Sequence, residues 1–227
     1  MSLVLSAKAQ SRPYKGIGME GLLARWYARN TKGSLADFRD LAKRIAAQLR
    51  PDALVLEVAP GPGFLAIEIA RLGPYRVSGV DISKTLVEIA QRNAAEARVD
   101  VEFRVGNASA LPFPANWFDF LVNRAAFKNF GDPVGALNEM HRVLRPGGTA
   151  LIIDMRKDAT AADIALEVSK MNLGGLSAAI TRLVLRWLRG RAYSRAEFEA
   201  MIARTPFGTA KIDEQLIGFE ITLTKST

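Results

Sequence analysis

The chain has 227 residues, 49% of them hydrophobic and 24% charged, which is the balance of a globular protein with a full core. This composition excludes a disordered chain. The lack of cysteine and the single histidine exclude a disulfide scaffold and a thiolate or multi-histidine metal centre, so we expect no metal. No apolar run approaches the roughly 20 residues that span a bilayer, and the apolar stretch among the first residues is too short for a secretory signal. We therefore expect a cytoplasmic protein.

The net charge of +8 is unevenly distributed along the chain. Residues 1–50 hold ten Lys or Arg against three Asp or Glu, residues 51–155 hold ten against twelve, and residues 156–227 hold eleven against eight. Basic ends of this kind indicate either contact with an anionic substrate, nucleic acid or membrane, or simply solvated helix faces. Charge alone leaves both interpretations open.

Helices and strands are predicted to alternate as far as residue 153. Ser34 and Asp37 resemble a capping box, which predicts a helix that Pro51 stops, and further helices are expected after Gly63, Ser83 and Asp132. Short strands are expected at 53–59, 76–80, 99–105, 118–122 and 149–153. Such alternation predicts βαβ units, a mostly parallel sheet with helices on both faces, and ligands beyond the carboxyl ends of the strands.

The pattern changes after Asp154. Residues 158–171, 176–189 and 194–204 are predicted to be helical, and two closing strands are expected over 211–214 and 215–225. We expect a helical cap over 1–50, a core over 51–227 and a helical lid inserted at about 158–205. The segment 176–191 forms a basic amphipathic helix, which indicates either peripheral contact with a membrane or a lid that packs on the domain.

A glycine-containing loop follows the first predicted strand. Gly61 and Gly63 let a ligand approach the backbone, and with Asp81 they also satisfy a loose dinucleotide-binding pattern. Glu57, four residues before Gly61, would repel a diphosphate but suits a ligand that carries an ammonium or sulfonium group, such as S-adenosylmethionine. Alternatively, Glu57 pairs with a basic side chain such as that of Arg25, Arg29 or Lys15.

Five segments in order resemble the motifs of class I S-adenosylmethionine-dependent methyltransferases. They are Glu57-x-Ala59-x-Gly61-x-Gly63, 77–83, 106–113, 117–123 and 142–148, so the resemblance covers residues 53–155. The subgroup it is most similar to comprises small-molecule methyltransferases related to quinone biosynthesis. The resemblance implies an α/β, Rossmann-like class I methyltransferase fold with a mostly parallel seven-stranded sheet.

The same resemblance implies which residues bind the cofactor. Asp81 would accept hydrogen bonds from both ribose hydroxyls, and Asn107 stands where the family usually has aspartate. Ala59 replaces the first glycine of the family motif. The cofactor-binding candidates are Glu57, Ala59, Gly61, Gly63, Asp81, Ile82, Asn107, Ala108 and Asn123.

Methyl transfer requires alignment of a nucleophile with the methyl group, and it needs a base only if the nucleophile keeps its proton. Asp154, after the fifth strand, is the predicted catalytic acid or base. Tyr27, Arg124 and Lys128 are candidates for binding the substrate, which we expect to be a small molecule. The alternative functions are an NAD(P)-dependent oxidoreductase on a Rossmann sheet and an RNA methyltransferase, although nucleic acid is not favoured because no separate RNA-binding module is present.

Overall fold

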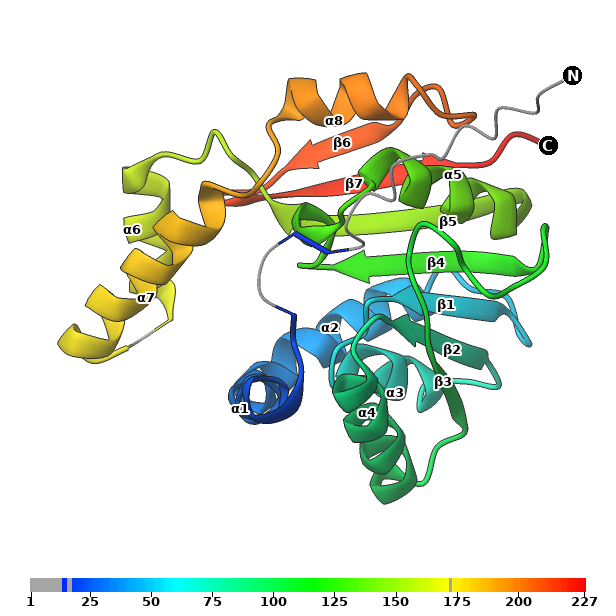
Figure 1. The fold of residues 1–227 in the computed structure, drawn as a ribbon, viewed down its shortest axis with the longest axis horizontal. Helices are drawn as coiled ribbons and strands as arrows, with labels where there is room; N and C mark the ends of the chain where they lie inside the picture. The colour runs from blue at the N-terminus through cyan, green and yellow to red at the C-terminus, as the bar shows by residue number, and fades with distance from the viewer. Residues whose placement is uncertain (1–13, 16–17, 172) are drawn as a thin grey trace, which may run out of the picture.

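A seven-stranded sheet forms the centre of the molecule, whose computed structural model describes residues 14–15, 18–171 and 173–227 (Figure 1). The strand order is β3-β2-β1-β4-β5-β7-β6; β1 to β5 are parallel, and β7 runs antiparallel to both β5 and β6. The predicted fold class is confirmed. The strands are β1 (Leu54–Val58), β2 (Arg76–Asp81), β3 (Val101–Val105), β4 (Phe118–Arg124), β5 (Leu144–Met155), β6 (Lys211–Glu214) and β7 (Gly218–Thr224).

Helices cover both faces of this sheet. On one face, α2 (Leu35–Ala46), α3 (Phe64–Ala70) and α4 (Lys84–Ala97) bury their apolar sides against the strands. On the other face, α5 (Pro133–Val143) and α8 (Arg195–Ile202) do the same. A further helix, α1 (Gly21–Thr31), packs on α4 through small buried side chains. The result is a three-layer sandwich in which the central strands β1 and β4 are buried, whereas β3, at one edge of the sheet, is half exposed.

The helix starts show which local signals the chain follows. Ser83 and Asp132 cap α4 and α5 as predicted, since their side chains accept from the N–H groups of Leu86 (3.1 Å) and Gly135 (2.8 Å). The predicted capping box at Ser34 is wrong. The chain enters α2 through a 3-10 turn, so the Leu35 N–H already bonds to a backbone carbonyl, and α2 ends at Ala46, ahead of Pro51.

Two helices of the predicted insertion project from the carboxyl edge of the sheet (Figure 1). They are α6 (Ala161–Lys170) and α7 (Gly175–Arg189), which share a small apolar cluster of their own. The third, α8, instead packs on the sheet beside α5. The division into a cap over 1–50, a core and a lid remains a prediction, and residues 1–13 and 16–17 of the cap lie outside the described residues.

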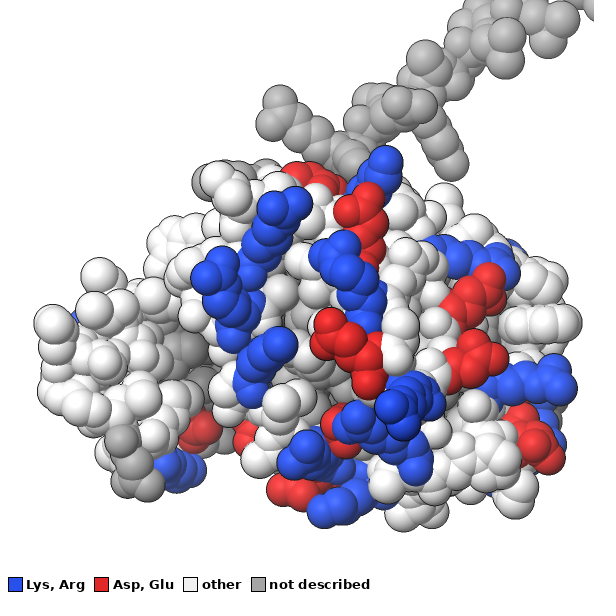
Figure 2. All heavy atoms as spheres, turned by 90° about the horizontal axis from the view of Figure 1, so that it is seen from below, with Lys and Arg blue, Asp and Glu red and all other residues white. Residues whose placement is uncertain are grey.

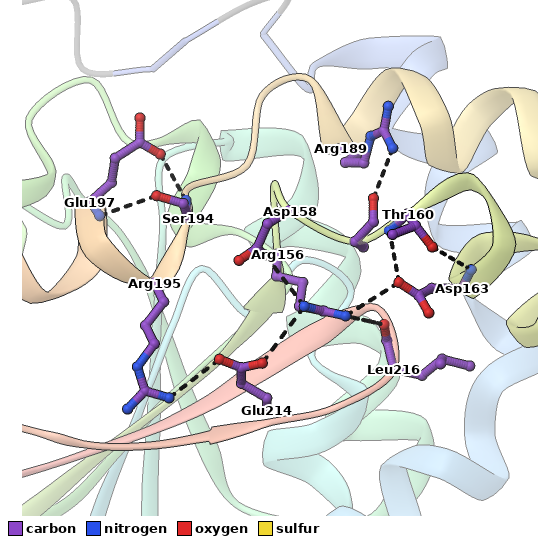
Figure 3. Close-up of polar contacts among 11 residues, drawn as sticks. Arg156, Asp158, Thr160, Asp163, Arg189, Ser194, Arg195, Glu197, Glu214 and Leu216 are labelled. Atoms are coloured by element: carbon purple, nitrogen blue, oxygen red, sulfur yellow. Dashed lines mark hydrogen bonds and ion pairs between the residues drawn. The ribbon is translucent and has the colours of Figure 1, made fainter.

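Arg156 attaches the projecting helices to the sheet, as Figure 3 shows. Its guanidinium donates to the Leu216 carbonyl (3.2 Å) and to the Asp163 carboxylate of α6 (3.3 Å), and it lies 3.7 Å from the Glu214 carboxylate of β6. Arg189, at the end of α7, donates to the Ala159 carbonyl (2.8 Å). These partly buried contacts fix α6 and α7 at the strand ends where a ligand is expected.

Candidate functional site

Two buried carboxylates lie at neighbouring strand ends. Glu57 is the next-to-last residue of β1 and Asp81 the last of β2, and the two strands pair directly. Their exposed fractions are only 3% and 5%. Because buried acids are costly unless they are paired or bind a ligand, this pair marks the carboxyl edge of the sheet as the candidate site.

The Asp81 carboxylate supports the glycine loop. It accepts from the N–H of Gly61 and from the N–H of Ser83, both at 2.9 Å. Burial raises the pKa of Asp81, and these two hydrogen bonds oppose the rise. Each carboxylate oxygen retains a further lone pair, so the contacts leave acceptors for the hydroxyls of a ribose.

The Glu57 carboxylate accepts fewer hydrogen bonds than the Asp81 carboxylate does. It accepts from the Ala66 N–H (2.9 Å) in the first turn of α3, and within the described residues it forms no ion pair, so the structure does not show the alternative pairing with Lys15, Arg25 or Arg29. Burial raises the pKa of Glu57 to about 8, against the opposing effects of the Ala66 N–H and the charge of Arg124. A bound cation would favour the ionised carboxylate.

The glycine loop has left-handed backbone at three positions. Gly61, Gly63 and Ala59 have φ of 55°, 79° and 58°. A Cβ on Gly63 would lie 2.6 Å from the Phe103 ring, whereas one on Gly61 would meet only the Tyr27 ring at 3.4 Å. Gly63 therefore permits close packing of the loop against the sheet, and Ala59 shows that a methyl group fits a left-handed position where there is room.

Asn123 provides an orphaned acceptor at the strand ends. Its side chain is 1% exposed and donates from Nδ2 to the Val58 carbonyl (2.7 Å), whereas Oδ1 has no hydrogen-bond partner among the described residues. A buried acceptor without a donor is destabilising. An ammonium group could supply the missing donor, so Asn123 and Glu57 together suit the amino acid moiety of S-adenosylmethionine.

The remaining cofactor candidates border Asp81. The Gly106 N–H donates to the Asp81 carbonyl (2.9 Å), which places the adjacent Asn107 and Ala108 beside the end of β2. The Asn107 Oδ1 accepts from the Ser109 N–H (3.0 Å), so its Nδ2 is the group available to a ligand. Ile82 is 37% exposed and offers an apolar surface. The three residues form an open edge of the site, suited to a flat ring.

Two of the substrate candidates lie close to the glycine loop. Tyr27 lies over Gly61, and burial raises the pKa of its hydroxyl. Arg124 ends β4 and stacks on the Phe38 ring at 4.4 Å, and its charge lowers the pKa values of both Glu57 and Tyr27. Both side chains therefore flank the cofactor end of the site.

Lys128 and Asp154 form a buried ion pair. The Lys128 Nζ lies 2.7 Å from Asp154 Oδ1, with side-chain exposures of 6% and 1%. Asp154 also accepts from the backbone N–H groups of Lys128 (2.9 Å) and Met155 (2.7 Å), and Lys128 Nζ donates to the Ala125 carbonyl. These contacts favour a structural role for both residues, and the catalytic role of Asp154 and the substrate contact of Lys128 remain predictions.

Replacement of Asp154 tests the two roles. We expect Asp154→Asn to lower the free energy of unfolding by about 3–5 kcal/mol, because the Lys128 ammonium is left buried without its counter-charge. The double variant Asp154→Asn, Lys128→Met should recover most of that loss, as measured by urea denaturation. A single variant as stable as the parent would contradict the structural role.

The N-terminal segment makes contacts with the start of α4 that the sequence patterns did not predict. Glu20 accepts from the N–H groups of Lys84 (2.9 Å) and Thr85 (3.1 Å) at the start of α4, and the Ser83 hydroxyl donates to the Met19 carbonyl. Tyr14 pairs with Phe130 in a short bridge, and burial raises its pKa while Asp81 and Arg191 act on it through their charges. No local motif marks these contacts, because the partners lie more than sixty residues apart.

The opposite edge of the sheet does not offer a second candidate site. A depression of about 500 Å³ lies at the opposite, amino edge of the sheet, where the lining residues Arg50 and Arg145 both already pair with Asp119. No cluster of His, Asp or Glu able to hold a metal is found in the described ranges. No described helix has the length and apolarity to cross a bilayer.

Comparisons with known proteins agree with the geometry. Residues 56–152 match the family model described as a methyltransferase domain. A demethylmenaquinone methyltransferase of Thermus thermophilus is 37% identical over 101 residues, which are 44% of this chain and 46% of that relative. This chain thus spans about half the length of the curated relatives that it matches.

Solved structures share the fold. A protein of Methanococcus maripaludis assigned to the S-adenosyl-L-methionine-dependent methyltransferases superposes with a TM-score of 0.73 at 20% identity, covering 94% of this chain and 96% of its own. A plantazolicin methyltransferase in complex with a monoazolic desmethylPZN analogue and SAH gives a TM-score of 0.68 at 13% identity, covering 90% of this chain and 89% of its own. The fold that the motif resemblance implies is confirmed, and the family match over residues 56–152 supports the resemblance itself.

Proposed function

We propose that the protein transfers a methyl group from S-adenosylmethionine to a small-molecule acceptor, because residues 56–152 match the methyltransferase domain family and the chain has the class I methyltransferase fold. The observation that carries the proposal is the pair of buried carboxylates on either side of the glycine loop. A cationic ligand is favoured beside Glu57, where a diphosphate would be repelled.

Different residues of this chain would bind the different parts of the cofactor. Asp81 would hold the ribose hydroxyls, Glu57 and Asn123 the ammonium group, and Ile82 and Asn107 the adenine. When bound, the cofactor supplies an activated methyl group on a sulfonium centre. The protein then has to orient the acceptor and exclude water, to which the helix α1 over the loop contributes.

The names of the relatives support a proposal about the chemical class of the acceptor. Several of them are named demethylmenaquinone methyltransferases, which supports a quinone-type small molecule for this chain as well. Neither alternative function receives support, because the matching family and the relatives named above are methyltransferases, and their names mention neither a nicotinamide cofactor nor RNA. A cytoplasmic location remains a prediction.

Substitution of Asp81 tests the proposal. We expect Asp81→Ala to weaken S-adenosylmethionine binding at least tenfold, about 1.4 kcal/mol, because the ribose acceptors and the support of Gly61 are both lost. Isothermal calorimetry on the purified chain measures this, with Asp100→Ala, an exposed acid just before β3, as the matched control. Unchanged affinity in Asp81→Ala, or binding of NADH in preference, would overturn the proposal.

A further inference from the structure

Two helices at the carboxyl edge of the sheet are basic, amphipathic and free of acidic residues. Neither α1 (GLLARWYARNT) nor α7 (GLSAAITRLVLRWLR) contains an Asp or Glu. Each buries only a small alanine face: Ala24 and Ala28 in α1, and Ala178 in α7. Helices of this composition are unusual on a soluble surface, where acidic and basic side chains normally alternate.

The outer face of α7 is strongly apolar. Five large side chains follow helical spacing along it and stay exposed: Leu176 (78%), Ile180 (56%), Leu183 (70%), Val184 (47%) and Trp187 (62%). Arg182 and Arg186 lie along one flank of this stripe and form no ion pair within the described residues. Trp187 also stacks with Arg191, whose guanidinium lies 5.2 Å from the indole ring.

The outer face of α1 repeats the arrangement. Leu22 is 83% and Trp26 61% exposed, one turn apart. On the flank of α1, Arg25, Arg29 and Lys32 line a depression of about 210 Å³ whose floor includes Phe64 and Ile89. None of these three cations is paired in the part of the chain that the structure describes. Three cations around one hollow suit a phosphate group.

Both faces lie on the same side of the molecule as the candidate site. Figure 1 shows α1 and α7 at the edge to which the strand β4 points, and Figure 2 shows that the visible face of the projection is mostly uncharged and lies beside a group of Lys and Arg. The opposite side of α1 places Tyr27 over Gly61 of the glycine loop. A surface that touches α1 therefore lies next to the opening of the site.

We infer that α1 and α7 together dock the protein on a bilayer that contains anionic phospholipid, with the apolar stripes in the interfacial region and the cations on the lipid phosphates. Charge complementarity carries this choice, since both helices offer only cations, and exposed tryptophans are typical of a membrane interface. The inference deepens the proposed function, on which it rests, because docking at this place would present the site to an acceptor dissolved in the bilayer.

The three tryptophans of the chain allow a direct test. Trp26 and Trp187 lie in the proposed surface, whereas Trp117, which is 45% exposed, precedes β4 at the opposite edge of the sheet. Variants that keep one tryptophan each, with phenylalanine at the other two positions, are mixed with vesicles of phosphatidylcholine and phosphatidylglycerol. We expect the emission of Trp26 and of Trp187 to shift to the blue and to be quenched by brominated lipid, and that of Trp117 to stay unchanged.

Sedimentation with the same vesicles measures the strength of docking. Arg182→Gln with Arg186→Gln should weaken binding about fivefold for each arginine removed. Arg76→Gln with Arg204→Gln, which removes two exposed arginines away from the surface, should leave it unchanged. Leu183→Ser with Trp187→Ser should abolish sedimentation, and its circular dichroism and S-adenosylmethionine affinity should match the parent, which separates loss of docking from loss of folding.

The outcomes decide the inference independently of the proposed function. Binding to phosphatidylglycerol vesicles with both tryptophan shifts supports it. Flat sedimentation, binding without a shift at Trp26 and Trp187, or salt-dependent binding of RNA in place of vesicles overturns it. Any of these overturning results leaves the calorimetry on Asp81→Ala unaffected, so the methyltransferase proposal stands or falls separately.

Discussion

Gly63→Ala is expected to destabilise the protein by about 2–5 kcal/mol and to abolish S-adenosylmethionine binding. Two costs combine at this position. The backbone is left-handed, with φ of 79°, and the added methyl group would lie 2.6 Å from the Phe103 ring and 2.9 Å from the Ala90 Cβ. Relief requires movement of α3 away from β3, which would also move the Ala66 N–H away from Glu57. Chemical denaturation measures the first effect and calorimetry the second.

Gly61→Ala serves as the matched control in the same loop. It has a similar left-handed φ of 55°, but the new methyl group would meet only the edge of Tyr27 at 3.4 Å. We therefore expect a loss of only about 1 kcal/mol, the cost of the backbone conformation alone. If the two variants lose equal stability, packing against Phe103 is not what requires glycine at position 63.

Binding of S-adenosylmethionine is expected to release a proton from Glu57 near neutral pH. With a pKa of about 8, the carboxyl is protonated at pH 7 in about nine of ten ligand-free molecules, whereas a cationic ligand favours the carboxylate. Affinity should therefore rise up to about tenfold per unit between pH 6 and 8 and then level off. Calorimetry in buffers of different ionisation enthalpy counts the proton released.

Glu57→Gln isolates this carboxyl from the ligand's own titration. The variant should bind S-adenosylmethionine more weakly, and the difference in pH dependence of the affinity between parent and variant should follow the ionisation of Glu57.

The same carboxyl affects stability. Because burial raises the pKa of Glu57 above its unfolded value of 4.5, the ligand-free parent loses stability as the pH rises from about 4.5 to 8. Glu57→Gln should hence be the more stable protein by a few kcal/mol at pH 9, but not at pH 4. If the affinities of parent and Glu57→Gln change with pH in parallel, Glu57 is not the group whose ionisation controls binding.

Much of the sheet and of the cofactor side could be predicted, because both depend on signals that are local in the chain. The buried apolar runs predict β1 and β4, and the Ser83 cap predicts the start of α4. The spacing from Glu57 through Gly61 to Asp81 likewise places two acids at adjacent strand ends, where the structure has them.

The contacts that close the site could not be predicted, because they join residues distant in sequence. Lys128 and Asp154 appear separately as a cation and an acid after two strands, and only the parallel pairing of β4 and β5 makes them partners. Local patterning also failed at Ser34, where the preceding turn had already supplied the backbone hydrogen bond. The chemistry of the acceptor depends on such distant contacts as well.

The short stretch from Asp81 to Thr85 serves two structures at once. Its first residue braces the loop that would receive the nucleoside, and its last three anchor Met19 and Glu20, from which the covering helix α1 starts. The glycine loop and the helix that covers it are thus held in place by the same short stretch. A substitution that shifts this stretch would move both the loop that receives the nucleoside and the helix α1. The fit of the cofactor and the access of the acceptor would therefore change together.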